Sequence, residues 1–393
     1  MPRFAPNTVA VPHSGIRRIH EIALRMDDVI GLAVGEPDVA VPPHVLRAAS
    51  EAWLADDTNY TANAGIAPLR EAIVQKLADL NGVQVEVEQV WVTQGATQAL
   101  YLAQSLVLAP GDQVLVPDPG YTTFTMGARM LQAEPVPYRL LPEHGFEPQV
   151  AELERLVTPA TRAIIVNSPS NPLGVVFGEA VLRSLLAFAE RHDLWVISDE
   201  VYEAFTFDTP HISPASLDDS GRVLGVYSFS KTYALTGGRV GYLVIPPGNA
   251  ATMRTFQEAM ISCVDTPAQR AALAALTGPQ DAVDAARMHY RGNFAAAARL
   301  LDERGLTYLT PQGAFYLWID MTHVSGGDVA GWAEGFLLDQ RVSVAPGSAF
   351  GASGEGWIRV CLAASRADLL TGLGRLPVPD GLRSEPRPET AAV

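Results

Sequence analysis

Short apolar runs alternate with longer mixed stretches through the middle of the chain. Five of these runs are rich in β-branched residues and have the length of buried strands: residues 90–92, 113–116, 162–166, 194–197 and 223–227. The stretches between them have room for helices. Buried strands separated by helices are typical of a largely parallel sheet that is covered on both faces. The pattern therefore predicts an α/β protein with a mostly parallel central sheet flanked by helices.

A second, smaller region is expected toward the C-terminus. An alanine-rich helical stretch there leads into two strand-like segments, residues 313–319 and 356–360. A chain of 393 residues is also too long for one ordinary core. We therefore expect a large domain at residues 46–279 and a smaller α+β domain formed by residues 1–45 and 280–376.

Composition and charge exclude several classes of protein. The chain is 48% hydrophobic and 18% charged, which is typical of a globular protein. Its net charge of −15 argues against a nucleic-acid surface, because phosphate backbones are bound by clustered basic residues. Cys263 and Cys361 give no disulfide framework, and the N-terminus lacks an export pattern, so we expect a cytoplasmic protein. Residues 377–393 are rich in proline and predict a disordered tail.

Each predicted strand is followed directly by a polar cluster. In chain order these clusters are residues 94–97, 117–121, 167–172, 198–200 and 228–231. The carboxyl ends of parallel strands meet at one edge of a sheet, and ligands of such sheets bind there. We therefore expect the five clusters to form one site.

Lysine is rare in this chain, where only Lys76 and Lys231 accompany twenty-six arginines. A lysine amine that loses its proton can attack a carbonyl and form a Schiff base, which a guanidinium cannot do. Lys231 follows a predicted strand in a turn rich in glycine and hydroxyl groups, a typical setting for an active-site residue. Lys76 lies beside the apolar stripe of a predicted helix, and we interpret it as a solvated surface residue. A coding bias toward arginine is the alternative explanation for both.

Residues around Lys231 form a candidate phosphate cage. Gly95-Ala96-Thr97 lies between a predicted strand and a predicted helix, where backbone N–H groups and the helix dipole attract anions. Ser228 and Arg239 flank Lys231 and would complete the cage.

Asp199 ends another apolar run. A carboxylate buried at that position needs a cationic or an N–H partner. A protonated pyridine nitrogen would meet this need, and so would the first N–H groups of a helix capped by Asp199. The local pattern leaves both interpretations open.

Together these motifs resemble those of the fold-type I pyridoxal-phosphate enzymes, specifically the class I aminotransferases of the aspartate aminotransferase family. The resemblance covers most of the chain and implies that family's large domain with a smaller α+β domain. Its motifs are Gly35-Glu36-Pro37-Asp38, Asn59-Tyr60-Thr61, Gly95-Ala96-Thr97, residues 167–172, Ser198-Asp199-Glu200-Val201-Tyr202, Ser228-Phe229-Ser230-Lys231-Thr232, Gly237-Gly238-Arg239-Val240-Gly241 and Ile358-Arg359-Val360.

The resemblance implies a role for each residue around the cofactor, pyridoxal 5′-phosphate. Lys231 would carry it as a Schiff base, and Asp199 would pair with the ring nitrogen. Asn171 and Tyr202 would hydrogen-bond the ring oxygen, and Tyr121 would stack on the ring. The residues implied to bind the phosphate are Gly95, Ala96, Thr97, Ser228, Arg239 and, from the second subunit of a homodimer, Tyr60.

The resemblance also implies the reaction and the substrate contacts. Arg359 would clamp the substrate α-carboxylate, with Asn171 and the backbone of Gly35 nearby. The reaction would be a ping-pong transfer of an amino group between an α-amino acid and a 2-oxo acid. Thr97 stands where an aspartate-preferring bacterial branch has a lysine, so we expect neutral or aromatic donors to compete with aspartate.

Other functions remain open on the sequence alone. A β-lyase uses the same scaffold and differs in which substrate bond is broken. Residues 228–231 also match the Ser-x-x-Lys pattern of penicillin-recognising enzymes, although the partner motifs of those enzymes are missing. A sensor domain of a transcription regulator would need a DNA-binding domain, and none is recognisable before Gly35. We expect no metal, because the eight histidines form no ligand motif.

Four aromatic residues near the second predicted region are expected in its core rather than at the substrate. They are Phe315, Tyr316, Trp318 and Trp357.

Overall fold

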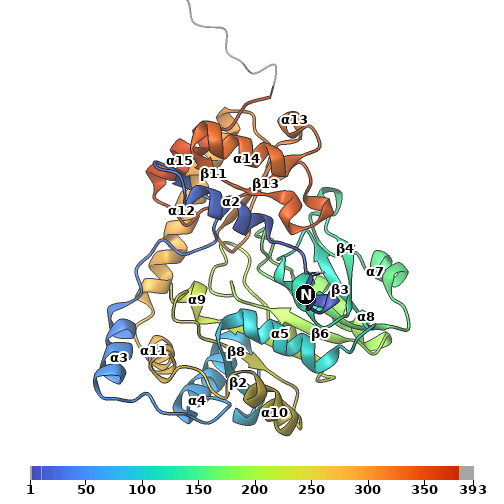
Figure 1. Ribbon diagram of the computed structural model, residues 1–393, viewed down its shortest axis with the longest axis vertical. Helices are drawn as coiled ribbons and strands as arrows, with labels where there is room; N and C mark the ends of the chain where they lie inside the picture. The colour runs from blue at the N-terminus through green and yellow to red at the C-terminus, as the bar shows by residue number, and fades with distance from the viewer. Residues whose placement is uncertain (1, 10, 380–393) are drawn as a thin grey trace, which may run out of the picture.

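The computed structural model describes residues 2–9 and 11–379, which contain a seven-stranded sheet, a four-stranded sheet and a two-stranded pair (Figure 1). The larger sheet and its helices form the lower part of the view in Figure 1, and the smaller sheet with α14 (Val329–Gln340) and α15 (Arg366–Gly374) lies above it. Residues 377–379 have no regular secondary structure, and residues 380–393 of the predicted tail lie outside the described residues.

The larger sheet has seven strands in the order β2-β8-β7-β6-β5-β3-β4. The strands are β2 (Val90–Thr93), β3 (Gln113–Asp118), β4 (Glu134–Arg139), β5 (Thr161–Asn167), β6 (Trp195–Asp199), β7 (Val223–Ser228) and β8 (Gly241–Val244). All five predicted strands are confirmed, and all neighbours are parallel except that β8 runs antiparallel to β2 and β7. The sheet is thus mostly parallel, as predicted.

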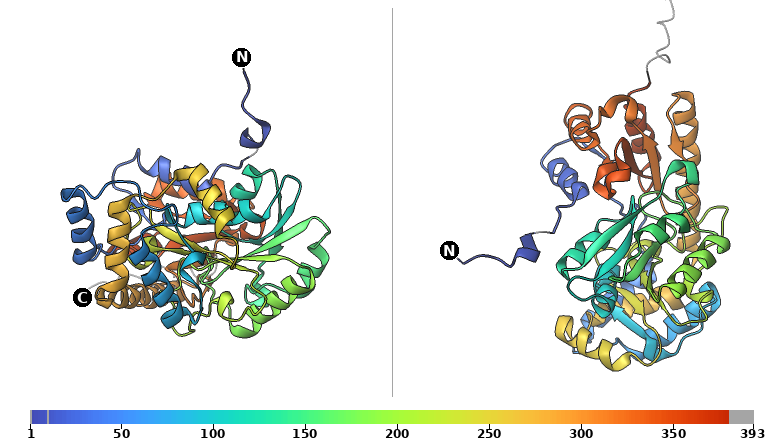
Figure 2. Two further views of the ribbon diagram at one scale, coloured as in Figure 1. Left: turned by 90° about the horizontal axis from the view of Figure 1, so that it is seen from below. Right: turned by 90° about the vertical axis from the view of Figure 1, so that its right-hand side faces the viewer.

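Helices cover both faces of this sheet, as Figure 2 also shows. One face packs against α5 (Gly95–Val107), α6 (Thr123–Met130) and α10 (Ala250–Ile261), which supply Leu100, Phe124 and Met253 to a shared apolar cluster. The opposite face is covered by α8 (Glu179–Arg191) along one half and by α4 (Ala67–Lys76) and α11 (Thr266–Thr277) along the other. The polar clusters lie at the carboxyl edge of this sheet, where α5 also begins.

The smaller region contains a four-stranded antiparallel sheet in the order β12-β13-β10-β9. Its strands are β9 (Tyr308–Leu309), β10 (Tyr316–Asp320), β12 (Ala345–Pro346) and β13 (Trp357–Cys361), so both predicted strand segments are confirmed. A short parallel pair, β1 (Ile30–Gly31) with β11 (Val342–Ser343), joins the N-terminal part of the chain to this region. The domain boundaries predicted from the sequence are compatible with this pairing and stay a proposal.

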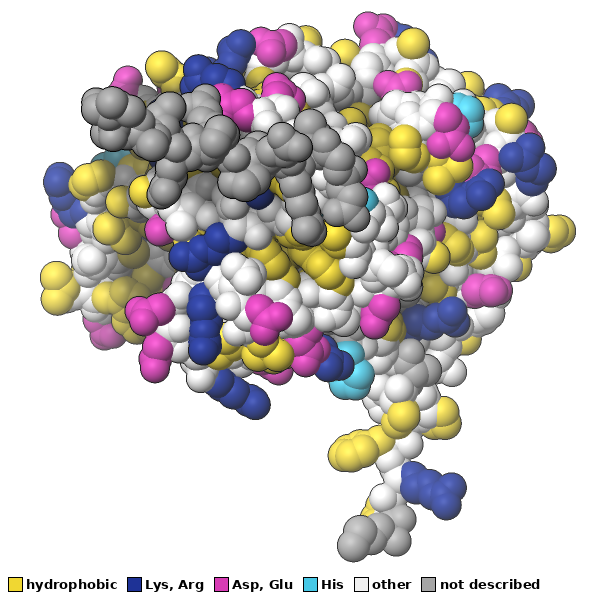
Figure 3. Space-filling view, turned by 90° about the horizontal axis from the view of Figure 1, so that it is seen from above, with side chains coloured by type: hydrophobic (Ala, Val, Ile, Leu, Met, Phe, Trp, Pro, Cys, Tyr) yellow, Lys and Arg dark blue, Asp and Glu magenta, His cyan; other side chains and the backbone are white. Residues whose placement is uncertain are grey.

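The remaining helices connect these parts. They are α1 (Pro6–Val9), α2 (Gly15–Ala23), α3 (Pro43–Leu54), α7 (Val150–Leu156), α9 (Phe229–Thr232), α12 (Asp281–Glu303) and α13 (Thr322–Ser325). Among the residues that the structure describes, no helix is both long and apolar enough to cross a bilayer. Acidic and basic side chains are interspersed on the described part of the upper face of the molecule (Figure 3).

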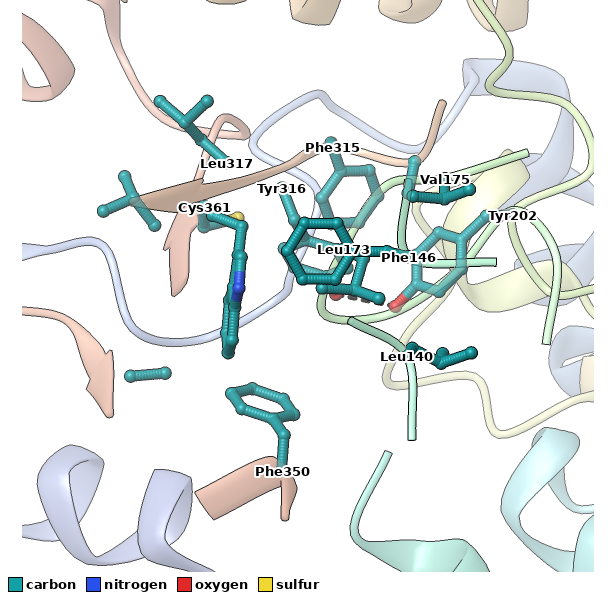
Figure 4. Packing of buried hydrophobic residues seen from close by; sticks show 14 of the residues in the cluster. Leu140, Phe146, Leu173, Val175, Tyr202, Phe315, Tyr316, Leu317, Phe350 and Cys361 are labelled. Atoms are coloured by element: carbon teal, nitrogen blue, oxygen red, sulfur yellow. Dashed lines mark hydrogen bonds between the residues drawn. The ribbon is translucent and has the colours of Figure 1, made fainter. Parts of the chain in front are cut away.

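One apolar cluster continues from the larger sheet into the smaller region. Figure 4 shows part of it, where Phe315 and Tyr316 of the smaller region meet Leu173 and Tyr202 of the larger one. Phe315, Tyr316 and Trp318 are almost fully buried, and Trp357 is half-buried against the same cluster, as expected for core residues. This shared core fixes the carboxyl edge of the seven-stranded sheet against the smaller sheet.

Candidate active site

A cavity of about 570 Å³ lies at the carboxyl edge of the seven-stranded sheet. All five predicted polar clusters contribute to its wall, so the prediction that they form one site is confirmed. The predicted site residues that line it are Gly35, Ala96, Thr97, Tyr121, Asn171, Asp199, Tyr202, Ser228, Lys231, Arg239 and Arg359.

Lys231 lies on the short helix α9, directly after β7. The turn is fixed by Ser228, whose Oγ accepts a hydrogen bond from the Ser230 N–H at 3.1 Å. Lys231 Nζ donates to the Gly35 carbonyl at 2.7 Å and forms no ion pair with a carboxylate of residues 2–9 or 11–379. Burial lowers the pKa of Lys231 to about 8. A substantial part of this amine is therefore neutral and nucleophilic near pH 8.

Asp199 ends β6 and is 3% exposed. Its Oδ1 accepts one hydrogen bond, a long one of 3.3 Å from the Val201 N–H. This contact matches the capping interpretation only in part, because no helix begins there. Burial raises the pKa of Asp199 to about 7, and no described basic group forms an ion pair with it. A buried carboxylate in a cavity without a counter-charge fits a cationic partner such as a protonated pyridine nitrogen.

The candidate phosphate cage lies where α5 begins. Gly95 has φ +72°, and a Cβ there would lie 2.6 Å from Nη2 of Arg239, so only glycine allows the guanidinium this close. Gly95 thus backs Arg239, whereas Ala96, Thr97 and Ser228 face the cavity. The helix N-terminus, two hydroxyls and a guanidinium suit a phosphate dianion.

Arg359 lies on β13 and is 2% exposed. It donates to Asn171 Oδ1 at 2.7 Å and to the Ala33 carbonyl, while its Nε has no partner among the described residues. The ring centres of Tyr316 and Phe350 lie 4.3 and 4.9 Å from the guanidinium carbon. A buried guanidinium bonded only to neutral acceptors suits a carboxylate ligand.

Tyr316 is a wall residue that the sequence did not indicate as one. It was expected in the core, and it is buried, but it also lines the cavity. Its hydroxyl lies 2.6 Å from that of Tyr202, and burial raises the pKa of Tyr202 well above its usual range (Figure 4). Asn167 is another: it lines the cavity, donates to the Asp199 carbonyl at 3.0 Å and accepts from the Asn171 N–H at 2.9 Å. The polar motif 167–172 was its only signal.

Tyr60 and Lys76, two residues that the sequence analysis singled out, do not line this cavity. Tyr60 is 90% exposed and does not line the cavity, so its implied phosphate contact needs a second subunit and stays a prediction. Lys76 was interpreted as a solvated surface residue, and this is wrong. Its side chain is 13% exposed, pairs with Glu203, and lies 4.9 Å from the centre of the Tyr227 ring. The apolar stripe beside Lys76 gave no sign that a distant carboxylate would cover it.

A cavity at the carboxyl edge of a mostly parallel sheet, holding a buried amine, a buried carboxylate and a candidate phosphate cage, indicates the fold-type I class of pyridoxal-phosphate enzymes. The family model for aminotransferase class I and II matches residues 27–376. The chain belongs to this family, whose class I members use pyridoxal phosphate, and it is an aminotransferase.

Individual relatives agree with that family. Aspartate aminotransferase of Pyrococcus abyssi is 37% identical over 370 residues, which cover 92% of this chain and 94% of the relative. Aromatic-amino-acid aminotransferase 2 of Thermococcus litoralis is 35% identical, with 92% and 94% covered. The solved structure of Thermus thermophilus aspartate aminotransferase with maleate has a TM-score of 0.90 at 34% identity and covers 95% of this chain and 99% of that chain. Each of these relatives carries an aminotransferase name, and none favours the β-lyase alternative.

Proposed function

We propose that Lys231 and Asp199 are the catalytic pair of this aminotransferase. The observation that carries the proposal is that both groups line one cavity, with Asp199 buried and Lys231 half-buried, and that neither has an ion-pair partner among the described residues. Lys231 would be the amine to which pyridoxal phosphate attaches, and Asp199 would be the carboxylate partner of its ring nitrogen. Thr97, Ser228 and Arg239 would hold its phosphate.

The residues of the chain then divide the reaction among them. When bound, pyridoxal phosphate supplies an electron sink that stabilises negative charge at the substrate Cα. Lys231 Nζ would accept the proton from the substrate Cα and later donate a proton within the same cavity, and its pKa of about 8 allows both roles near neutral pH. Arg359 and Asn171 would orient the α-carboxylate, and Tyr121 and Tyr202 would help to hold the cofactor ring. The donor leaves as a 2-oxo acid before the acceptor enters, which is a ping-pong order.

The cavity supports a broad choice of amino donors. Leu100, Tyr121 and Tyr316 give it apolar and aromatic wall, which suits an aromatic or neutral side chain. Arg17 on α2 also lines it and gives a side-chain carboxylate a cationic partner. The relatives named above include both aspartate and aromatic-amino-acid aminotransferases. We therefore infer that aromatic donors compete with aspartate.

A homodimer is part of the same proposal. Trp53, Leu54 and Tyr60 are 60%, 88% and 90% exposed, and large apolar side chains this close in sequence are typical of a protein interface. Tyr60 would reach the phosphate of the partner's cavity. A cytoplasmic location also remains our inference, supported by the free thiols of Cys263 and Cys361.

The half-reaction tests this function. Protein loaded with pyridoxal phosphate is mixed with aspartate or phenylalanine and no acceptor, and the products are measured. An aminotransferase releases one 2-oxo acid per site and stops until an acceptor is added. Continuous release of pyruvate and ammonia from a β-substituted alanine, without an acceptor, would instead identify a β-lyase. Lys231→Ala is the control and should release nothing.

A further inference from the structure

Two loops that are far apart in sequence meet beside the cavity. The β3 loop comprises residues 118–122, and the β12–β13 loop comprises residues 347–354 with two short 3₁₀ turns. Because the first loop belongs to the seven-stranded sheet and the second to the four-stranded sheet, their contact joins the two regions. Two direct hydrogen bonds link them: Gly120 N–H to the Phe350 carbonyl at 2.8 Å and Thr122 Oγ1 to the Ala349 carbonyl at 3.0 Å.

A buried carboxylate strengthens this contact. Asp118 is 6% exposed, and it accepts hydrogen bonds from the Ser353 N–H at 3.1 Å and from the Ser353 Oγ at 3.0 Å. Gly351 allows the approach, because a Cβ there would lie 2.0 Å from Oδ1 of Asp118. No ion pair neutralises Asp118 within residues 2–9 and 11–379. A carboxylate is costly to bury, so its hydrogen bonds to Ser353 add to the two direct bonds that hold the loops together, and their loss would weaken the contact.

Each loop carries one residue that matters at the cavity. Tyr121 belongs to the β3 loop and lines the cavity. Phe350 belongs to the β12–β13 loop, and its ring centre lies 4.9 Å from the guanidinium carbon of Arg359. Fixing the loops against each other therefore fixes Tyr121 relative to Arg359.

We propose that Asp118 is a positioning residue, which joins the two loops through Ser353 and so sets the distance between the cofactor face and the substrate carboxylate site. The inference rests on the proposed roles of Tyr121 and Arg359. Asp118 does not line the cavity, so it acts on binding rather than on the proton transfer. Its loss should weaken the binding of cofactor and donor and leave kcat nearly unchanged.

Asp118→Asn tests this inference because it keeps the size of the side chain but replaces one acceptor oxygen with a donor. Asp320→Asn is the matched control. Asp320 also accepts from a backbone N–H and a hydroxyl, those of Thr322 at 2.8 and 2.7 Å, but both donors lie two residues further along the same segment, so Asp320 joins no two loops. Ser353→Ala removes only the hydrogen bond from the Ser353 hydroxyl. It provides a second test if Asp118→Asn does not fold.

Two measurements report on the contact between the two loops without turnover: hydrogen exchange of the apoprotein and its Kd for pyridoxal phosphate. The KM for the donor is measured in addition by steady-state assay. For Asp118→Asn we expect about tenfold faster exchange in both residues 118–124 and residues 347–354, and about a tenfold rise in Kd and in KM. Ser353→Ala should show about a threefold effect on each, and Asp320→Asn none.

The inference is overturned if Asp118→Asn matches Asp320→Asn in Kd, or if exchange rises in residues 347–354 alone. A fall in kcat with unchanged Kd and KM would also contradict it, because Asp118 would then act on the chemistry. Failure of the proposed function would look different. The variants would still show the expected changes in exchange and in Kd, but the unaltered protein would transfer no amino group.

Discussion

The two lysines of this chain lie in two largely buried groups of charges near the end of β7. We call a group balanced when its lysine forms an ion pair with a carboxylate, and only the group of Lys76 is balanced. Lys76 pairs with Glu203, which also accepts from Asn81 at 2.6 Å. Lys231 has a single neutral acceptor, the Gly35 carbonyl, and the nearby carboxylate of Asp199 has a single long N–H contact.

The carboxylate next in sequence to Asp199 sharpens the contrast. Glu200 is fully buried, and it has four partners in Ser198, Ser213, Tyr227 and His211 at 2.8 to 3.0 Å. The carboxylates of Glu200 and Glu203 and the His211 ring lie within 4.8 Å of one another, as ligands of a metal would. Their oxygens are nevertheless already engaged by the ammonium of Lys76 and by neutral donors. A buried charge with protein partners thus supports the fold, whereas one without them indicates a missing ligand.

Substitutions of the two lysines should differ most in their effect on activity. Lys231→Ala should reduce kcat/KM by about 10⁴-fold or more, because it removes both the attachment point and the base. Lys76→Ala makes the same chemical change in the balanced group and should stay within about threefold of the unaltered enzyme. Steady-state assays with aspartate and phenylalanine check this, with circular dichroism to confirm that each variant is folded. Equal losses in the two variants would remove the distinction between the groups.

Stability should show the opposite order. Lys76→Met leaves Glu203 without its cation and should lower the free energy of unfolding by about 3 kcal/mol. Lys231→Met should not destabilise the apoprotein, because that amine has no counter-charge to lose. Arg18→Ala is a control, since its ion pair with Glu334 is 71% and 32% exposed and should contribute less than about 1 kcal/mol. Urea unfolding at pH 7 measures all three, and a stable Lys76→Met variant would contradict the account.

The pH dependence of stability sharpens the comparison further. The pKa of Asp199 is raised from 3.8 to about 7, so the folded apoprotein binds a proton that the unfolded chain has lost over this range. Stability therefore falls as the pH rises from about 4 to about 7, and no further above it. Asp199→Asn lacks this loss and should be about 4 kcal/mol more stable than the unaltered apoprotein at pH 8, but not at pH 4. Parallel stability curves for the two proteins would count against an unpaired Asp199.

The smallest effect is expected at Tyr60. Tyr60→Phe removes one hydroxyl from the implied phosphate contact across a dimer and should raise the Kd for pyridoxal phosphate about fivefold. Tyr308→Phe is the control, because its hydroxyl bonds Asp302 on an exposed surface. Cofactor titration of the dimer measures both variants. An unchanged Kd for Tyr60→Phe would mean that Tyr60 does not reach the phosphate.

Much of this site was predictable from local patterns. Asp199, Lys231 and Asn171 each follow an apolar run, and parallel strands bring such ends together whatever the details of packing. The missed strands had weaker signals. β4 contains two prolines and lies at the edge of the sheet, where proline is tolerated, and β8 is a short run after several glycines that turns antiparallel.

Contacts between distant segments were not predictable. The burial of Lys76 depends on Glu203, which lies 127 residues further along the chain. The place of Tyr316 in the cavity wall depends on its hydroxyl meeting Tyr202, and the role proposed for Asp118 depends on Ser353. The last two pairings are set by how the smaller sheet docks on the larger one, and the first by how α4 packs against the segment after β6. No periodicity along the chain encodes either packing.

Reductive trapping tests the central claim most directly. The protein is loaded with pyridoxal phosphate, reduced with borohydride, digested and mapped by mass spectrometry. The chain offers only two ε-amines for the adduct, at Lys76 and Lys231. We predict one cofactor adduct per chain, on the peptide that contains Lys231. An adduct on the Lys76 peptide, or none on either, would contradict the account.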